Sequence, residues 1–193
     1  MMKRAMVGIA AAAIAFVPAV SHAQRASASA SQPLYFAMGA GIALPLSDFA
    51  NAVGTGFHVE GLGTKQLSGS PVFLRGELGF TLYGDKSYGG GLSGKGNQIG
   101  GVMDLGYSFV STSTIKPYVL GGLGVHRTSL TVDAGLNNGS STADNTALGF
   151  NAGAGMRFKM GAHVAYLEGR YMNQGNWNGG TVASFPIAFG VEF

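Results

Sequence analysis

The chain has 193 residues, 12 basic and 9 acidic side chains, and no cysteine. This length suits one domain of ordinary size, and the lack of cysteine excludes disulfides and a cysteine-linked lipid anchor. Lys3 and Arg4 belong to a predicted leader, so the net charge of the remaining chain is close to zero. The remaining chain therefore has no basic surface of the kind that binds nucleic acid. Mean hydropathy is positive (+0.23), yet no later segment has 18 successive apolar residues. Spanning strands are therefore favoured over spanning helices.

Residues 1–23 are predicted to be a cleaved signal peptide. A basic start, Met1–Arg4, precedes an alanine-rich apolar stretch over 5–20, and Ser21-His22-Ala23 supplies small residues before a cut. The apolar stretch is shorter than the roughly 20 residues that cross a bilayer as a helix. Residues 24–33, rich in serine and alanine, are expected to be a flexible lead-in to the folded domain.

Eight runs of alternating apolar and polar residues follow, and this period of two predicts strands. The fifth run alternates poorly, because Val119, Leu120 and Leu123 fall on both parities. The runs cover residues 34–44, 57–60, 72–82, 98–109, 116–128, 148–160, 165–171 and 185–193.

These runs predict an all-β fold over residues 34–193, an eight-stranded antiparallel up-and-down transmembrane β-barrel. Runs of about ten residues match a strand that crosses a bilayer at a tilt of about 45°. The sheet must close, because an unpaired edge cannot lie in hydrocarbon. Side chains can fill the interior of an eight-stranded barrel, which explains many small residues on the inward face.

The connections alternate in length, and this orients the predicted barrel. Long links are expected at 45–55, 84–97, 129–146 and 173–181, and short ones at 66–71, 110–115 and 159–162. Short periplasmic turns and long extracellular loops are typical of outer-membrane barrels. An aromatic girdle near the strand ends is expected from Tyr35, Phe36, Tyr83, Tyr107, Phe109, Tyr171 and Phe193.

The last run ends on an aromatic residue at the chain terminus. Phe185, Phe189, Val191 and Phe193 share one face with Ile187. This pattern resembles the C-terminal signal that the barrel-assembly machinery reads, so we expect these four residues to form an assembly signal.

A soluble eight-stranded barrel of lipocalin type fits the same alternation with its faces inverted. The apolar residues would then face the interior, and the charged residues would face water. The predicted signal peptide, the loop asymmetry and the terminal Phe193 favour the membrane barrel.

Charged residues on the inward parity are the candidate site. Buried charges must pair or be hydrated, so we expect a lumen network with nearly balanced charge. It could be a structural plug, or a switchable set of pairs that gates a narrow pore. The expected members are Glu60, Arg75, Glu77, Asp104, Arg157, Lys159, Glu168 and Arg170, with Glu192 as a further candidate.

The chain after the leader resembles the small outer-membrane β-barrel family that includes OmpA and OmpX. The resemblance lies in Gly39–Gly41 with Pro45–Phe49, Pro117-Tyr118 with Gly121, Gly122 and Gly124, Glu168–Tyr171, and Phe193. It implies an outer-membrane location. With no further domain after Phe193, cell-wall anchoring is not implied.

No catalytic, cofactor or metal site is expected. His58 and Glu60 share a face, but no serine partner stands out. His126 with Ser129 faintly resembles the lipid A deacylases, with a different spacing. No two histidines lie close enough in sequence to suggest a shared metal ion.

The expected function is structural or surface-interactive, through extracellular loops whose ligand the sequence does not identify. The first alternative is a small-solute pore of low conductance, and the second a lipid-modifying enzyme. The expected partners are outer-membrane lipids and the barrel-assembly machinery, and the expected state is a monomer.

Overall fold

The computed structural model describes residues 33–109, 114–134 and 139–193. The predicted signal peptide and the lead-in up to residue 32 lie outside this range. Within it, no helix is long and apolar enough to cross a bilayer. The elements are β1 (Leu34–Leu46), α1 (Phe49–Ala52), β2 (Gly56–Gln66), β3 (Val72–Gly89), β4 (Leu92–Ser108), β5 (Ile115–Asp133), β6 (Ser140–Met160), β7 (His163–Trp177) and β8 (Gly180–Glu192).

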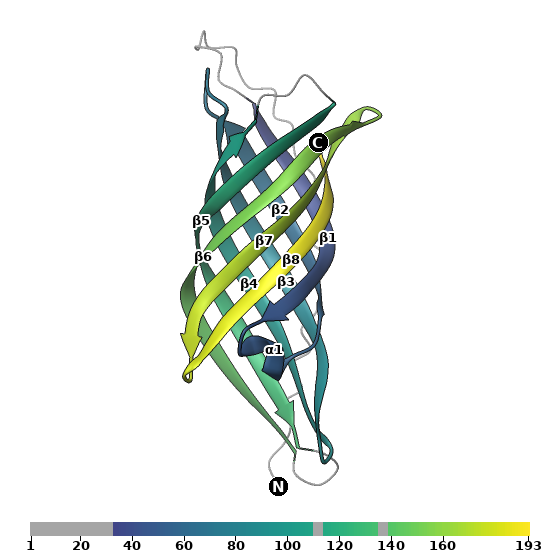
Figure 1. Ribbon diagram of the computed structural model, residues 1–193, viewed down its shortest axis with the longest axis vertical. Helices are drawn as coiled ribbons and strands as arrows, with labels where there is room; N and C mark the ends of the chain where they lie inside the picture. Colours follow the sequence, from purple (N-terminus) through teal and green to yellow (C-terminus); the bar gives the residue numbers. More distant parts are fainter. Residues whose placement is uncertain (1–32, 110–113, 135–138) are drawn as a thin grey trace, which may run out of the picture. The chain divides into compact units, whose positions relative to one another are not determined.

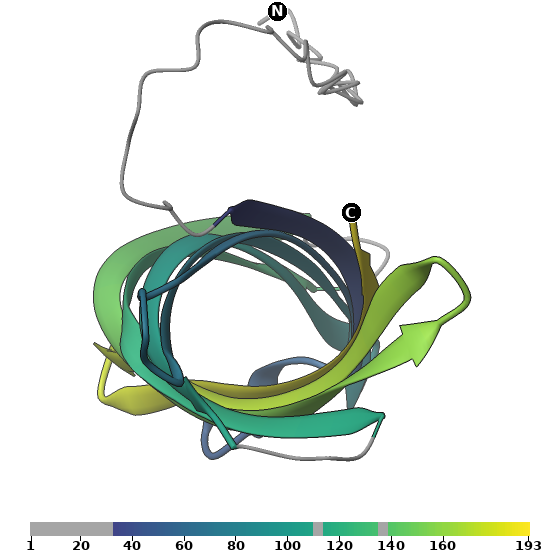
Figure 2. The same cartoon turned by 90° about the horizontal axis from the view of Figure 1, so that it is seen from above.

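The eight strands form one closed antiparallel barrel in sequence order (Figure 1). The view along the barrel shows the strands as a ring (Figure 2). β8 pairs with β1 to close it, from Ala37 opposite Glu192 to Leu46 opposite Ala183. Beyond that ladder, the Phe193 amide donates to the Phe36 carbonyl at 2.9 Å. The predicted fold class is confirmed, and no sheet edge is left unpaired in the ring.

The barrel wall is apolar outside and polar inside. Leu148, Leu78 and Met38 face outward with 79%, 73% and 66% of their surface exposed. On the inward parity, Arg75 and Glu168 are buried. Exposing such an apolar belt to water costs about 25 cal/mol per Å², whereas hydrocarbon removes this cost. The soluble-barrel alternative is therefore wrong.

The fifth predicted strand does alternate regularly. Val119, Leu123 and Val125 face outward and are exposed, whereas Tyr118 and Leu120 are buried on the inner face. Leu120 packs inside in a cluster with Phe73 and Tyr118. The alternation was obscured in the sequence because this end of the interior is lined by apolar side chains.

Three of the four predicted long loops are mostly strand. β3 and β4 remain paired to Gly89 opposite Leu92, and β5 and β6 to Asp133 opposite Ser140. β7 and β8 pair to Trp177 opposite Gly180. Thr131 and Val132 in the β5–β6 segment suit a two-stranded ladder, and glycines with positive φ at 89, 90 and 91 make the β3–β4 turn. We call this end of the barrel the hairpin end, and the end with Leu34 and Phe193 the terminal end.

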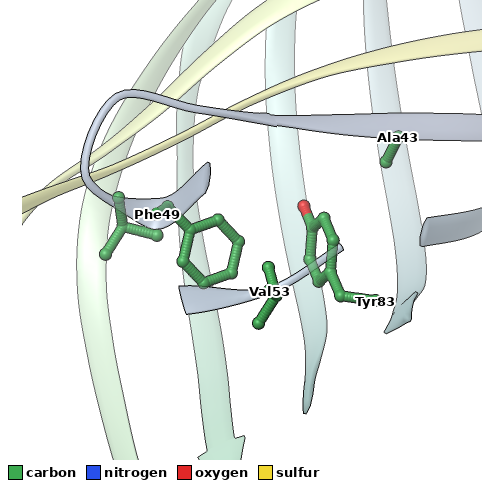
Figure 3. Close-up of a cluster of buried hydrophobic side chains, with 5 residues drawn as sticks. Ala43, Phe49, Val53 and Tyr83 are labelled. Atoms are coloured by element: carbon green, nitrogen blue, oxygen red, sulfur yellow. The ribbon is translucent and has the colours of Figure 1, made fainter. Parts of the chain in front are cut away.

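The remaining long link folds back over the hairpin end of the lumen. Phe49 and Val53, from α1 and its C-cap, are buried against Ala43, Tyr83 and Val182 in an apolar cluster that we call the mouth cluster (Figure 3). The rings of Phe49 and Tyr83 meet edge to face, with centroids 4.9 Å apart. Tyr83 therefore points inward and does not join the aromatic girdle, a correction to the expectation from sequence.

Candidate functional site

Among the described residues, six acidic or basic side chains other than histidine are buried inside the barrel. They come from β2, β3, β4 and β7, and each stands on the inward parity of its strand. They are Glu60, Arg75, Glu77, Asp104, Glu168 and Arg170, with at most 7% of the surface of any one exposed. We call them the lumen cluster.

Arg170 on β7 is the centre of this cluster. Its guanidinium lies 2.6 Å from Glu77 and 3.2 Å from Asp104, and it also contacts Glu168. Asn151 donates a hydrogen bond of 2.8 Å to the other oxygen of Asp104. One cation therefore joins three carboxylates from β3, β4 and β7, across the interior of the barrel.

Arg75 on β3 provides the second cation. Its Nη1 donates to Glu168 Oε2 at 2.5 Å, and the Tyr118 hydroxyl donates to the same oxygen at 2.6 Å. Glu168 is therefore bound by both arginines. Such buried, charge-assisted hydrogen bonds are individually strong, and removing one partner leaves a buried charge uncompensated.

Glu60 on β2 is held by a tyrosine and a histidine instead of an arginine. The Tyr166 hydroxyl donates to its Oε1 at 2.6 Å, and His58 Nε2 lies 3.2 Å from Oε2. The other ring nitrogen of His58 is 2.8 Å from the Thr81 hydroxyl. Among the described residues, Glu60 has no arginine or lysine partner, so its charge is not offset by a fixed cation.

The lumen cluster is not electrically balanced. It holds four carboxylates and two guanidiniums, which leaves two negative charges when the histidines are counted as neutral. Sequence reasoning expected near neutrality, because it placed Arg157 and Lys159 in the same group. The structure places both elsewhere.

Arg157 and Lys159 lie toward the terminal end of β6. Arg157 forms a separate pair with Glu192 at 2.6 Å, and its guanidinium is 5.0 Å from the ring centroids of both Phe73 and Tyr118. Lys159 is exposed and has no ion pair within the part of the chain that the structure describes. Neither therefore offsets the surplus carboxylates.

The lumen between the cluster and the hairpin end is also polar. Gln98 donates to the Thr128 hydroxyl at 3.0 Å, which donates in turn to Gln174 at 2.9 Å. His126 is buried nearby, with 3% of its surface exposed. This layer links β4, β5 and β7 across the interior.

Side chains thus obstruct the lumen at more than one level. The lumen cluster spans the middle, the Gln98 layer follows, and the mouth cluster covers the hairpin end. An arrangement of this kind stiffens and fills a barrel. Parity alone predicts the six members of the lumen cluster but wrongly adds Arg157 and Lys159. Tyr118, Tyr166 and Asn151 were missed, because neutral polar residues on the inward parity gave no distinct signal.

The fold is similar to solved outer-membrane barrels at low sequence identity. Neisserial surface protein A aligns with a TM-score of 0.60 and 22% identity, over 85% of this chain and 98% of that one. Ail, the attachment invasion locus protein of Yersinia pestis, aligns with a TM-score of 0.55 and 12% identity, over 84% and 99%. The N-terminal β-barrel domain of Pseudomonas aeruginosa OprF gives 0.50 and 19%, over 84% and 99%.

No curated protein matches the sequence. The profile of the outer membrane protein beta-barrel domain family matches residues 9–193, nearly the whole chain. That match agrees with the closed eight-stranded ring, the apolar outer wall and the polar interior. The chain therefore belongs to the outer membrane protein beta-barrel domain family, and its place is the outer membrane.

Proposed function

We propose that this protein acts at the cell surface as a rigid barrel that presents its hairpin end to a binding partner. The observation that carries the proposal is the pair of long hairpins, β3–β4 and β5–β6, which continue as paired strands beyond α1 (Figure 1). Preorganised backbone lowers the entropic cost of binding. The obstructed lumen favours such a role over transport.

The side chains at the hairpin end indicate the chemistry of the partner. Lys95 pairs with Asp133 at 3.3 Å, and Arg127 with Asp144 at 3.2 Å. Hydrogen bonds from Ser129 and Arg127 lower the pKa of Asp144, so this carboxylate stays charged at neutral pH. Because the exposed charges are largely paired with each other, the hairpin end presents a polar, nearly neutral surface to a partner.

One solved structure of Ail holds the heparin analogue sucrose octasulfate. The described hairpin end of this chain carries three basic residues against four acidic ones, so it does not favour a polyanion. The basic residues are Lys86, Lys95 and Arg127, and the acidic residues are Asp48, Asp85, Asp133 and Asp144. We therefore propose uncharged glycan or protein surfaces as the partner class.

Shortening the β5–β6 hairpin should abolish surface binding without unfolding the barrel. Residues 132–141 would be replaced by an Asn-Gly turn between Thr131 and Thr142, which face each other across the ladder. Lipid vesicles carrying either protein would be tested on arrays of neutral glycans, sulfated glycans and matrix proteins. We expect at least a tenfold loss on whichever neutral surface binds the unaltered protein.

A matched variant shortens the β3–β4 tip, residues 88–92, and separates the contributions of the two hairpins. Folding of every variant would be checked by the mobility difference between boiled and unboiled samples on a gel. Binding that survives both deletions, or binding confined to sulfated glycans, would contradict the proposal.

The pore alternative makes a distinct electrical prediction. We expect the unaltered barrel to be silent in planar bilayers, because the Arg170 ion pairs and the mouth cluster both obstruct the lumen. Exchanging Glu168 for glutamine loosens the contacts to both arginines and should give the first detectable openings. Steady single-channel current from the unaltered protein would favour the pore instead.

We propose no catalytic role. His126 points into the lumen, and Ser129 lies three positions along β5 and so on the opposite face of the strand. A histidine buried inside the wall has no access to a lipid ester outside it. This arrangement supports a non-enzymatic barrel.

Export, assembly and oligomeric state remain part of the same proposal. We propose that residues 1–23 are removed on export and that the barrel functions as a monomer. Phe189 and Phe193 are exposed on the outer face of β8 and beyond it, with 45% and 63% of their surface accessible, and Phe185 and Val191 share their parity. This supports recognition of the four residues by the barrel-assembly machinery before the β1–β8 seam closes.

A further inference from the structure

Three metal-binding side chains meet in the lumen next to the Arg170 network. One ring nitrogen of His58 and one carboxylate oxygen each from Glu60 and Glu77 lie within 4.8 Å of one another. All three are buried, and they come from the adjacent strands β2 and β3. Sequence spacing did not reveal this group, because it contains one histidine and spans two strands.

The surplus negative charge of the lumen lies at the same place. Glu168 is bound by both guanidiniums and Asp104 by the guanidinium of Arg170, whereas Glu60 has no guanidinium partner and Glu77 shares Arg170 with two other acids. Two uncompensated charges in a region of low dielectric are costly unless they are neutralised. A divalent cation would supply the two positive charges that balance these carboxylates.

A second, independent observation is a small cavity beside these residues. Its lining includes His58, Glu77, Gln98 and His126, and its free volume of about 10 Å³ holds about one water molecule or ion. His126 is 3% exposed, and within the described residues its ring has no hydrogen-bond partner. An unpartnered imidazole that faces a polar cavity is a free donor for a ligand.

Gly79 on β3 leaves room at this point. A Cβ atom there would lie 3.1 Å from His58 Cε1 and 3.5 Å from Glu77 Oε1. The missing side chain therefore keeps the space between the imidazole and the carboxylate open. Glu77 uses its Oε2 for Arg170, so its Oε1 is available.

We propose that His58, Glu60 and Glu77 form a transition-metal site in the lumen, beside the cavity that His126 also lines, and that Zn²⁺ is the ion it suits best. Imidazole with carboxylates favours zinc over magnesium or calcium, which prefer oxygen ligands only. Zinc holds nitrogen and oxygen donors at about 2.0–2.2 Å, so the side chains must draw together by a fraction of an ångström to about 1 Å.

The outer partners of the ligands are already in place. Thr81 holds the far nitrogen of His58, and Tyr166 holds the far oxygen of Glu60. Hydrogen bonds of this kind orient metal ligands and increase affinity. They also leave one nitrogen of His58 and one oxygen of Glu60 directed at each other, 3.2 Å apart.

The test measures metal retained by the folded barrel. Untagged protein from outer membranes would be unfolded in urea with a chelator, then refolded in detergent with Zn²⁺, because the obstructed lumen restricts entry after folding. Gel filtration in metal-free buffer removes loose ions, and the metal is then quantified by atomic spectroscopy. We expect about one Zn²⁺ per chain, and visible absorption of nitrogen- and oxygen-bound Co²⁺ when cobalt replaces zinc.

Variants separate the proposed site from adventitious binding. His58→Ala and Glu60→Gln should each weaken retention at least tenfold, whereas His163→Ala, at an exposed histidine, should leave it unchanged. Variants that fail the gel-mobility check would be set aside, and the cobalt spectrum of the unaltered protein would then decide. The proposal is overturned if the folded protein retains no metal, or if His163→Ala alone removes it.

Discussion

Exchange of Arg170 for methionine is expected to reduce the free energy of unfolding by about 3–5 kcal/mol, the usual cost of breaking a buried ion pair from one side. The variant keeps most of the side-chain length but leaves Glu77, Asp104 and Glu168 without their common cation. Urea unfolding in lipid vesicles, followed by fluorescence of Trp177, the only tryptophan, measures the loss.

The matched control is Arg127→Met, at the exposed pair with Asp144. Exposed ion pairs contribute about 0–1 kcal/mol, so this change should hardly move the urea midpoint. Equal losses in both variants would mean that the lumen cluster does not stabilise the barrel more than a surface pair does.

Exchange of Gly41 for alanine is expected to prevent most chains from closing the barrel. A Cβ at this inward position of β1 would lie 1.9 Å from the backbone oxygen of Ile187 and 2.8 Å from Ala188 Cα. Backbone atoms of β8 cannot move away without loss of the β1–β8 ladder. Overpacking costs about 1–3 kcal/mol and occasionally more, and we expect at least the upper value here.

Gly61→Ala is the control on the neighbouring strand β2. Gly61 faces outward, and a Cβ atom at this position would meet no atom within 4 Å. The folded fraction after refolding, measured from unboiled gel mobility, should fall sharply for Gly41→Ala and stay unchanged for Gly61→Ala. Similar folded fractions in the two variants would show that the seam tolerates a methyl group.

The face of the barrel wall on which a side chain lies was easier to predict from the sequence than the structure at the ends of the strands. Parity placed Arg75, Glu77 and Asp104 inside correctly, since a strand puts successive side chains on opposite faces. It failed for Tyr83, because an aromatic residue near a strand end suits either the lipid interface or the inward mouth cluster. The link at 45–55 was expected to be a long extracellular loop, and the inward packing of its Phe49 depends on side chains from β3 and β8.

The sequence by itself determined that this is a closed barrel, because eight period-two runs in a bilayer can satisfy their backbone only in a closed sheet. The predicted signal peptide, the loop asymmetry and the terminal Phe193 then favoured a polar interior over an apolar one. Only the tertiary structure decided which charges meet. Strand stagger sets the position of each residue along the lumen, and it brings Arg170 to three carboxylates while Arg157 lies nearer the terminal end, beside Glu192. The same stagger joins His58 and Glu60 to Glu77, since register depends on the whole ring.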